Sequence, residues 1–251
     1  MKKLTSVSFV LLTLVFCVAN AMAQFPDDSR TNQPPFPEKP IAAAATSPKP
    51  EPRVVKEGPL APAPADVANY QYLLDQHNTG LIRLLPRESY DWGVYPVEKK
   101  LKIRGGGTFF SFHFRDHSYD SASDLSLDKG FLSVGFAGAN YGMLTDIGAE
   151  SLEQIDLQSP GVAFMLNYKA PTKEPVARIE AQKFYPAFTV EDAAYTRKLH
   201  GEVNHTYLLR SINYGYSDVL VAFHIARQDE DGSLIIAWKL LKEFPTPQLD
   251  R

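Results

Sequence analysis

Histidine side chains are the first candidates for chemistry in this chain. His113 and His117 stand four residues apart, and His200 and His205 flank Glu202 in an expected loop. In a strand, residues four positions apart share a face but lie about 13 Å from each other. That distance is too great for both rings to bind one metal ion at a Zn–N distance of about 2 Å. A divalent metal would therefore need a composite site in which His113 or His117 meets His200 or His205.

Basic and aromatic side chains form a second group of candidates. A β-hairpin that turns at residues 105–107, which are all glycine, is predicted over residues 100–115. It places basic side chains on one face, where they could bind an anionic glycan or a lipid head group, although a solvated sheet face has the same pattern. Trp92 lies in an aromatic segment that could stack on sugars or pack beneath the sheet. The candidate ligand-binding residues are Lys100, Lys102, Arg104, Arg115 and Trp92.

Missing motifs leave several enzyme classes without support in the sequence. The chain has no G-x-S-x-G elbow, no P-loop and no dinucleotide-binding glycine motif, so no organic cofactor is predicted. Its one cysteine, Cys17, falls in the N-terminal leader, so the exported chain is expected to have neither a thiol nucleophile nor a disulfide. Aspartates recur every four residues among serines over residues 116–128, which we interpret as an exposed loop because a calcium loop needs denser oxygen ligands.

The first 23 residues predict a secretory signal peptide. Lys2 and Lys3 precede an apolar run over residues 7–18, and Ala21 and Ala23 are the small residues expected before the cleavage point. The run is shorter than the about 20 apolar residues of a spanning helix. No later apolar segment is longer, so we expect no transmembrane segment in the exported chain. The protein should be periplasmic or extracellular.

A proline-rich linker is predicted over residues 24–65. Eleven of the 19 prolines fall there, and alanine, serine, lysine and glutamate fill much of the rest. A segment of this composition cannot bury enough apolar surface to offset its chain entropy, so we expect it to be disordered and extended.

Residues 66–251 predict one mainly β domain, an antiparallel sandwich or barrel-like fold with one or two short helices. Capping residues suggest helices over residues 67–77 and 191–199. The predicted strands, marked by short apolar runs, span residues 80–85, 130–137, 151–157, 162–168, 176–184 and 207–212.

A C-terminal β-hairpin is the most strongly patterned element. Two long apolar runs flank a polar turn, and pairing Gln228 with Ser233 sets Phe223 beside Trp238. Both faces are largely apolar, so these strands should be central in the sheet. His224 lies among apolar neighbours, which suggests a core histidine held by a hydrogen bond.

Two segments, residues 206–214 (TYLLRSINY) and 217–223 (SDVLVAF), resemble exported bacterial proteins without an assigned function. The resemblance covers the β domain and not the linker, and it implies no activity and no site residues.

The favoured function is a binding or scaffolding module of the bacterial envelope, with an envelope component or a protein as partner. One alternative is a hydrolase that cuts an envelope glycan or ester with carboxylates and histidines from separate loops. Another is a metal-binding module that uses the histidines. Removing residues 1–23, which hold two lysines and no acidic residue, makes the net charge of −3 more negative still. An acidic chain argues against nucleic-acid binding, which depends on neutralising phosphates.

Overall fold

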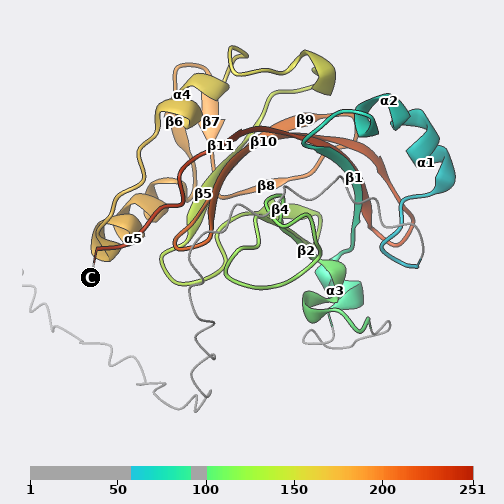
Figure 1. Ribbon diagram of the computed structural model, residues 1–251, viewed down its shortest axis with the longest axis horizontal. Helices are drawn as coiled ribbons and strands as arrows, with labels where there is room; N and C mark the ends of the chain where they lie inside the picture. The colour runs from blue at the N-terminus through green and yellow to red at the C-terminus, as the bar shows by residue number, and fades with distance from the viewer. Residues whose placement is uncertain (1–57, 92–100, 251) are drawn as a thin grey trace, which may run out of the picture. The chain divides into compact units, whose positions relative to one another are not determined.

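The fold is mainly β. A computed structural model describes residues 58–91 and 101–250, all within the unit Pro48–Arg251. This part of the chain has three antiparallel sheets, of five, four and two strands, and five short α-helices (Figure 1). The predicted fold class is therefore confirmed, with more helices than expected. Leu60, inside the predicted linker, is buried in a cluster with Leu85 and Tyr90, so packing begins before residue 66.

A curved five-stranded antiparallel sheet forms the framework of the domain (Figure 1). Its strands, in spatial order, are β1 (Thr79–Leu84), β11 (Leu234–Glu243), β10 (Ser217–Gln228), β9 (Thr206–Asn213) and β5 (Tyr141–Asp146). Side chains on both faces of the inner strands are mostly apolar, because both faces are covered.

The C-terminal hairpin, β10 and β11, has the predicted pairing at its centre. Phe223 pairs with Trp238, and both strands are central in the sheet. Beyond Ile225 a β-bulge shifts the register, so that Gln228 pairs with Leu234 and not with Ser233, the predicted partner.

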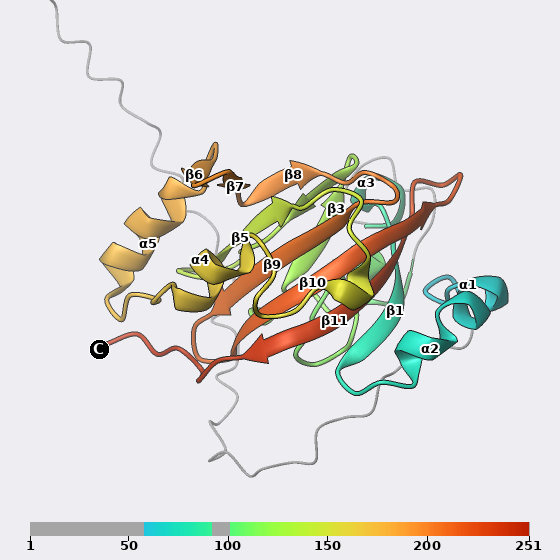
Figure 2. The same ribbon diagram turned by 90° about the horizontal axis from the view of Figure 1, so that it is seen from above.

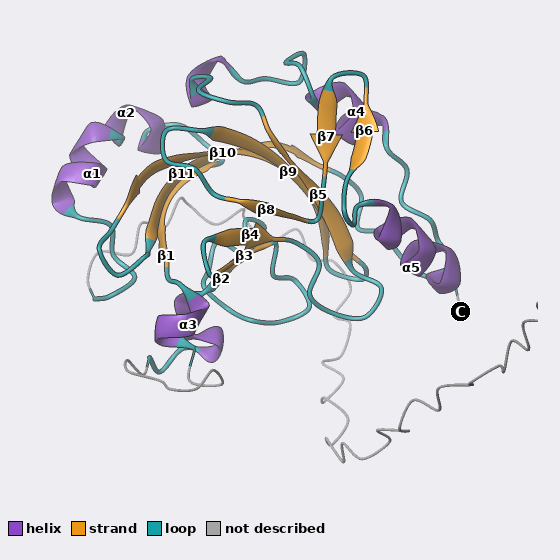
Figure 3. Ribbon diagram, turned by 180° about the vertical axis from the view of Figure 1, so that it is seen from behind, coloured by secondary structure: helices purple, strands orange, loops and turns teal. Residues whose placement is uncertain are grey.

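A four-stranded antiparallel sheet packs on one face of the large sheet (Figures 1 and 3). Its strands, in spatial order, are β2 (Phe109–Phe110), β3 (Leu125–Asp128), β4 (Phe131–Ser133) and β8 (Lys198–His200). Phe110, Phe112 and Leu125 share a core with Phe223 and Trp238 of the large sheet. The stacked sheets form the sandwich that the sequence predicted.

Helices and a small hairpin lie on the opposite face of the large sheet (Figure 2). These elements are α1 (Pro64–Asn69), α2 (Gln71–Leu74), the 3-10 turn η2 (Leu152–Gln154), α4 (Val162–Asn167), α5 (Glu174–Lys183), β6 (Phe188–Val190) and β7 (Ala193–Tyr195). Val162 and Met165 of α4 share a second core with Leu208, Leu220 and Ile235 of the sheet. One sheet thus separates two hydrophobic cores, and the second core supports α4 and the β6–β7 hairpin.

A buried ion pair fixes α4 against the sheet. Arg210 of β9 donates from Nε and Nη2 to the two carboxylate oxygens of Asp218 at 2.9 and 2.8 Å. Its Nη1 donates to the carbonyl oxygen of Tyr168 at 2.6 Å and also to that of Met165. The ring of Phe244 lies 3.8 Å from the guanidinium carbon. The two carbonyl oxygens lie at the C-terminal end of α4, so Arg210 ties this end of the helix to β9. Removing Arg210 or Asp218 would leave an uncompensated buried charge.

Three segments predicted as strands are helical in the structure. Residues 151–157 contain η2, residues 162–168 contain α4, and residues 176–184 overlap α5. Short apolar runs fit a strand or a buried helix equally well by periodicity alone, which is why the prediction was wrong. Helical packing is clear in α4, where residues three apart, Val162 and Met165, are both buried.

Two further sequence predictions are wrong. Residues 191–199, predicted as a helix, form the turn of the β6–β7 hairpin, strand β7 and the start of β8. The expected hairpin over residues 100–115 is replaced by a 3-10 turn, η1 (Arg104–Gly107), and β2 pairs with β3 instead. Gly105, Gly106 and Gly107 all have positive φ, which winds the chain away from a hairpin. The helix expected over residues 67–77 divides into α1 and α2, and α3 (Arg87–Tyr90) follows β1.

Candidate ligand-binding cavity

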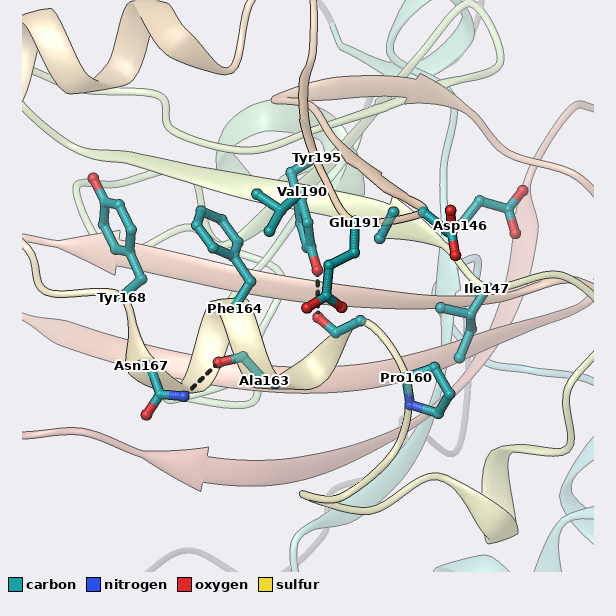
Figure 4. Close-up of a pocket in the computed structure, with 13 residues that line it drawn as sticks. Asp146, Ile147, Pro160, Ala163, Phe164, Asn167, Tyr168, Val190, Glu191 and Tyr195 are labelled. Carbon is teal, nitrogen blue, oxygen red and sulfur yellow. Dashed lines mark hydrogen bonds between the residues drawn. The ribbon is translucent and has the colours of Figure 1, made fainter.

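A cavity of about 590 Å³ lies between α4 and the β6–β7 hairpin, at the end of β5 (Figure 4). Its lining comes from three separate segments of the chain, around residues 146–147, 160–168 and 190–195. Small-molecule sites typically have volumes of about 300–1,000 Å³. The cavity therefore has the size of a site for a small ligand.

Aromatic rings form one wall of the cavity. Phe164 lies on α4, and Tyr168, four residues further on, is the residue that follows the helix. The ring of Tyr195, from β7, lies with its centroid 4.6 Å from that of Phe164. The Tyr195 hydroxyl donates a hydrogen bond of 2.8 Å to the carbonyl oxygen of Gly161, which ties the hairpin to the start of α4 (Figure 4). The wall is thus apolar and fixed at both ends.

Three carboxylates also line the cavity. Asp146 ends β5, while Glu191 and Asp192 are the two central residues of the β6–β7 turn. Figure 4 shows the side chain of Glu191 extending from this turn toward α4, beside the Tyr195 hydroxyl. Burial raises the pKa of Tyr195, and the charge of Glu191 raises it further. The phenol therefore stays protonated and keeps its hydrogen bond.

Glu191 has an unusual backbone conformation. Its φ is 53°, in the left-handed region, whereas Asp192 is not among the residues with positive φ. Two-residue hairpin turns with positive φ at the first central position normally have glycine there. Glu191 thus holds its carboxylate at the mouth of the cavity from a position that favours glycine.

Most side-chain hydrogen-bond donors on the cavity wall are already engaged, and Asn167 uses one of its two amide N–H groups. Asn167 donates from Nδ2 to the carbonyl oxygen of Ala163 at 2.9 Å (Figure 4). The Tyr168 hydroxyl lies 2.8 Å from the Tyr141 hydroxyl and 3.2 Å from Oε2 of Glu180. The wall consequently presents acceptor oxygens and ring faces to a ligand.

His205 is the only one of the four proposed histidine ligands that contacts a residue of the cavity, within the part of the chain that the structure describes. Its Nδ1 lies 2.9 Å from Oδ2 of Asp146, and this hydrogen bond raises the pKa of His205. His200 instead packs its ring against Phe131 on the small sheet, with centroids 5.4 Å apart.

His113 and His117 do not share a strand face. The chain reverses between them, because Ser111 and Asp116 form an isolated bridge around a tight turn. His113 Nδ1 lies 2.8 Å from Oε1 of Glu243, and His117 Nε2 lies 3.0 Å from the carbonyl oxygen of Arg83. Within residues 58–91 and 101–250, no three His, Cys, Asp or Glu side chains lie close enough to hold a metal ion. Metal binding by these histidines stays a prediction.

The proposed basic residues do not form one sheet face. Arg104 lies 5.3 Å over the ring of Tyr119, at the start of η1. Arg115 is buried, 3.1 Å from Oδ1 of Asn78 and 6.0 Å from the ring of Trp238. Lys102 is exposed. Lys100 and Trp92 lie outside the described residues.

Asp124, expected in an exposed loop, is completely buried. Its Oδ2 accepts a hydrogen bond of 2.7 Å from the backbone N–H of Phe112, and its Oδ1 accepts one of 2.8 Å from Nδ2 of Asn213. Burial penalises the charged carboxylate and raises its pKa to about 6. The Asn213 side-chain oxygen has no hydrogen-bond partner among the described residues. This cluster holds the loop after Ser111 to the end of β9 and lies apart from the cavity lining.

A second hollow, of about 340 Å³, lies beside α5 and the loop before β5. Its arginines are already engaged: Arg178 pairs with Glu174 at 2.6 Å, and Arg197 donates to the carbonyl oxygen of Gly135 at 2.9 Å. The larger cavity is therefore the stronger candidate for a site.

Comparisons of the chain with protein-family models, curated proteins and solved structures gave no match. None of the helices that the structure describes has the length and apolar character needed to cross a membrane. The geometry of the cavity is accordingly the basis for assigning a function.

Proposed function

We propose that this protein is an exported binding module of the bacterial envelope that holds a small ligand between α4 and the β6–β7 hairpin. The supporting observation is the cavity of about 590 Å³, with its aromatic wall and its carboxylates. The leader pattern in the first 23 residues supports export.

Binding fits this cavity better than nucleophilic catalysis does. None of the described residues that line it is a serine, threonine or cysteine, the usual nucleophiles. His205 is a candidate for a general base, but it contacts Asp146 from outside and is not one of the residues that line the cavity.

A glycan hydrolase is the second candidate function. Asp146 and Glu191 bring carboxylates from separate segments to one cavity, and most glycosidases use a pair of carboxylates. Release of nitrophenol from chromogenic glycosides by the full-length protein, abolished in Glu191→Gln, would favour the hydrolase over the binding module.

The binding function can be tested by blocking the cavity. Ala163 is an exposed residue of α4 that lines the cavity, so Ala163→Trp should fill the space without disturbing either core. Ala68→Trp, at an exposed position of α1, is the matched control. The measurement is the melting temperature of the full-length protein in a library of cationic, neutral and anionic small molecules.

We expect at least one compound to raise the melting temperature of the wild type and of Ala68→Trp, but not of Ala163→Trp. A ligand at 100 times its Kd stabilises the folded state by about 2.7 kcal/mol, which gives a clear shift. If no compound in any class shifts the wild type, or if Ala163→Trp responds like the wild type, the cavity is not the binding site.

A further inference from the structure

We infer that the ligand of the cavity is a small organic cation, a primary amine or diamine on a short apolar chain. The inference rests on the proposed function, because it names the class of ligand that the same cavity accepts. Three properties of the cavity support it: its charge, its ring faces and its hydrogen-bonding groups.

Negative charge at the cavity is not balanced by basic residues in its lining. Asp146, Glu191 and Asp192 line it, and none of the described lining residues is a lysine or arginine. Protonated His205 offsets the charge of Asp146. Glu191 and Asp192 form no ion pair with any residue that the structure describes. A cation entering here gains attraction, while an anion is repelled.

Ring faces provide a second source of affinity for a cation. Phe164 and Tyr168, four residues apart, are partly exposed, while Tyr195 is buried and packs its ring against Phe164. Aromatic faces attract ammonium groups through the ring quadrupole, and they pack against the alkyl chain that carries the amine. A short diamine could set its chain along the rings and direct an ammonium group toward Glu191.

Hydrogen bonding separates a cation from a neutral sugar. The hydroxyls of Tyr168 and Tyr195 and one N–H of Asn167 are engaged with the protein, so carboxylate acceptors outnumber the free side-chain donors of the lining. An ammonium group has only donors and therefore matches this set. A sugar hydroxyl both donates and accepts and would leave many of its acceptors unpaired.

Titration calorimetry on the full-length protein with three molecules of equal length tests the inference. The molecules are 1,5-diaminopentane, 1,5-pentanediol and glutarate, which share a five-carbon chain and have cationic, neutral and anionic end groups. We expect binding of the diamine alone, with an affinity that falls as salt screens the carboxylates. Binding of the diol or glutarate in preference to the diamine would overturn the inference.

Variants of the acidic residues locate the interaction. Glu191→Gln keeps the shape of the side chain and should weaken diamine binding about fivefold, the size of a well-placed but exposed charge pair. Glu230→Gln, in the exposed β10–β11 turn, removes the same charge elsewhere and should leave the affinity unchanged. Equal losses in both variants would contradict a contact at Glu191.

The two proposals fail in different ways. If the diamine does not bind, but another compound stabilises the wild type and not Ala163→Trp, the cation inference is wrong and the binding function stands. If Ala163→Trp changes the response to no ligand at all, the binding function is wrong as well.

Discussion

Glu191 combines a backbone conformation that favours glycine with a side chain that faces the cavity. Its φ of 53° costs a residue with a Cβ about 1 kcal/mol. Relief of this strain is offset by the greater freedom of glycine in the unfolded chain, so we expect Glu191→Gly to be about 1 kcal/mol more stable than the matched variant Asp192→Gly and also to weaken diamine binding. Urea denaturation and calorimetry on the same variant measure both effects. A gain in stability with a loss of binding would show that the turn gives up stability for function.

The neighbouring turn residue provides the control for this variant. Asp192 is exposed and is not among the residues with positive φ. Asp192→Gly therefore relieves no strain, and it should lower stability because glycine gains more freedom in the unfolded chain. If Glu191→Gly proves no more stable than Asp192→Gly, the turn holds no strain at Glu191.

Some single residues could be interpreted from sequence, and others could not. His224, predicted as a core histidine held by a hydrogen bond, lies 2.9 Å from Oγ1 of Thr206. The burial of Asp124 could not be predicted, because its partner Asn213 lies 89 residues further along the chain. Glu191 and Asp192 resembled a helix start. They line the cavity because they form the turn of the β6–β7 hairpin, whose strands are too short to show an alternation of apolar and polar residues.

At the scale of the element, Gly80 lets the ring of Trp238 lie directly on β1. The two residues pair across β1 and β11, and a Cβ at Gly80 would stand 2.6 Å from Cε2 of Trp238. We expect Gly80→Ala to lower the free energy of unfolding by about 2 kcal/mol, because the buried ring has no room to move. Urea denaturation of the full-length protein measures the loss.

A double-mutant cycle shows whether the ring is the cause. In a Trp238→Leu background, which removes the ring, Gly80→Ala should cost far less than in the wild type. An equal cost in both backgrounds would assign the effect to the strand backbone and not to the contact.

The elements that the sequence predicted best are long, and those it missed are short. The β10–β11 hairpin has 12 and 10 residues in its strands, enough for the apolar pattern to fix both its existence and its central position. By contrast, α4 has only six residues. Phe164 and Tyr168, four apart, share a face in a helix and in a strand alike. The sequence therefore could not show that these two residues form the wall of a cavity.

At the scale of the whole molecule, one sheet with a core on each face buries two titratable groups of opposite behaviour. Burial raises the pKa of Asp124 to about 6 and lowers the pKa of His117 to about 4. The Asp124 contribution to stability is fully present below its unfolded pKa of 3.8 and is lost as the pH rises through about 6. The His117 contribution is present above 6.5 and is lost as the pH falls through about 4.

These two contributions oppose each other between pH 4 and pH 6.5. Each shift, of a little over two pKa units, corresponds to about 3 kcal/mol, so the stability of the wild type should change little from this pair. Asp124→Asn leaves His117 alone, and stability should then fall by about 3 kcal/mol more than in the wild type on acidification from pH 6.5 to pH 4. His117→Gln leaves Asp124 alone, so its stability should rise on the same acidification from pH 6.5 to pH 4.

Urea denaturation at pH 4, 5.5 and 6.5 measures these slopes. Exposed carboxylates titrate in the same window, but they do so equally in all three proteins, so the differences between the slopes isolate the two buried groups. In Asp124→Asn the new NH2 group takes the place of an oxygen that accepts from Nδ2 of Asn213. A half-turn of the Asn213 amide, whose oxygen has no partner among the described residues, restores this hydrogen bond with its direction reversed. Parallel slopes in the wild type and Asp124→Asn would mean that Asp124 titrates in the folded protein as it does in the unfolded chain. The two-core burial would then not control the pH dependence of folding.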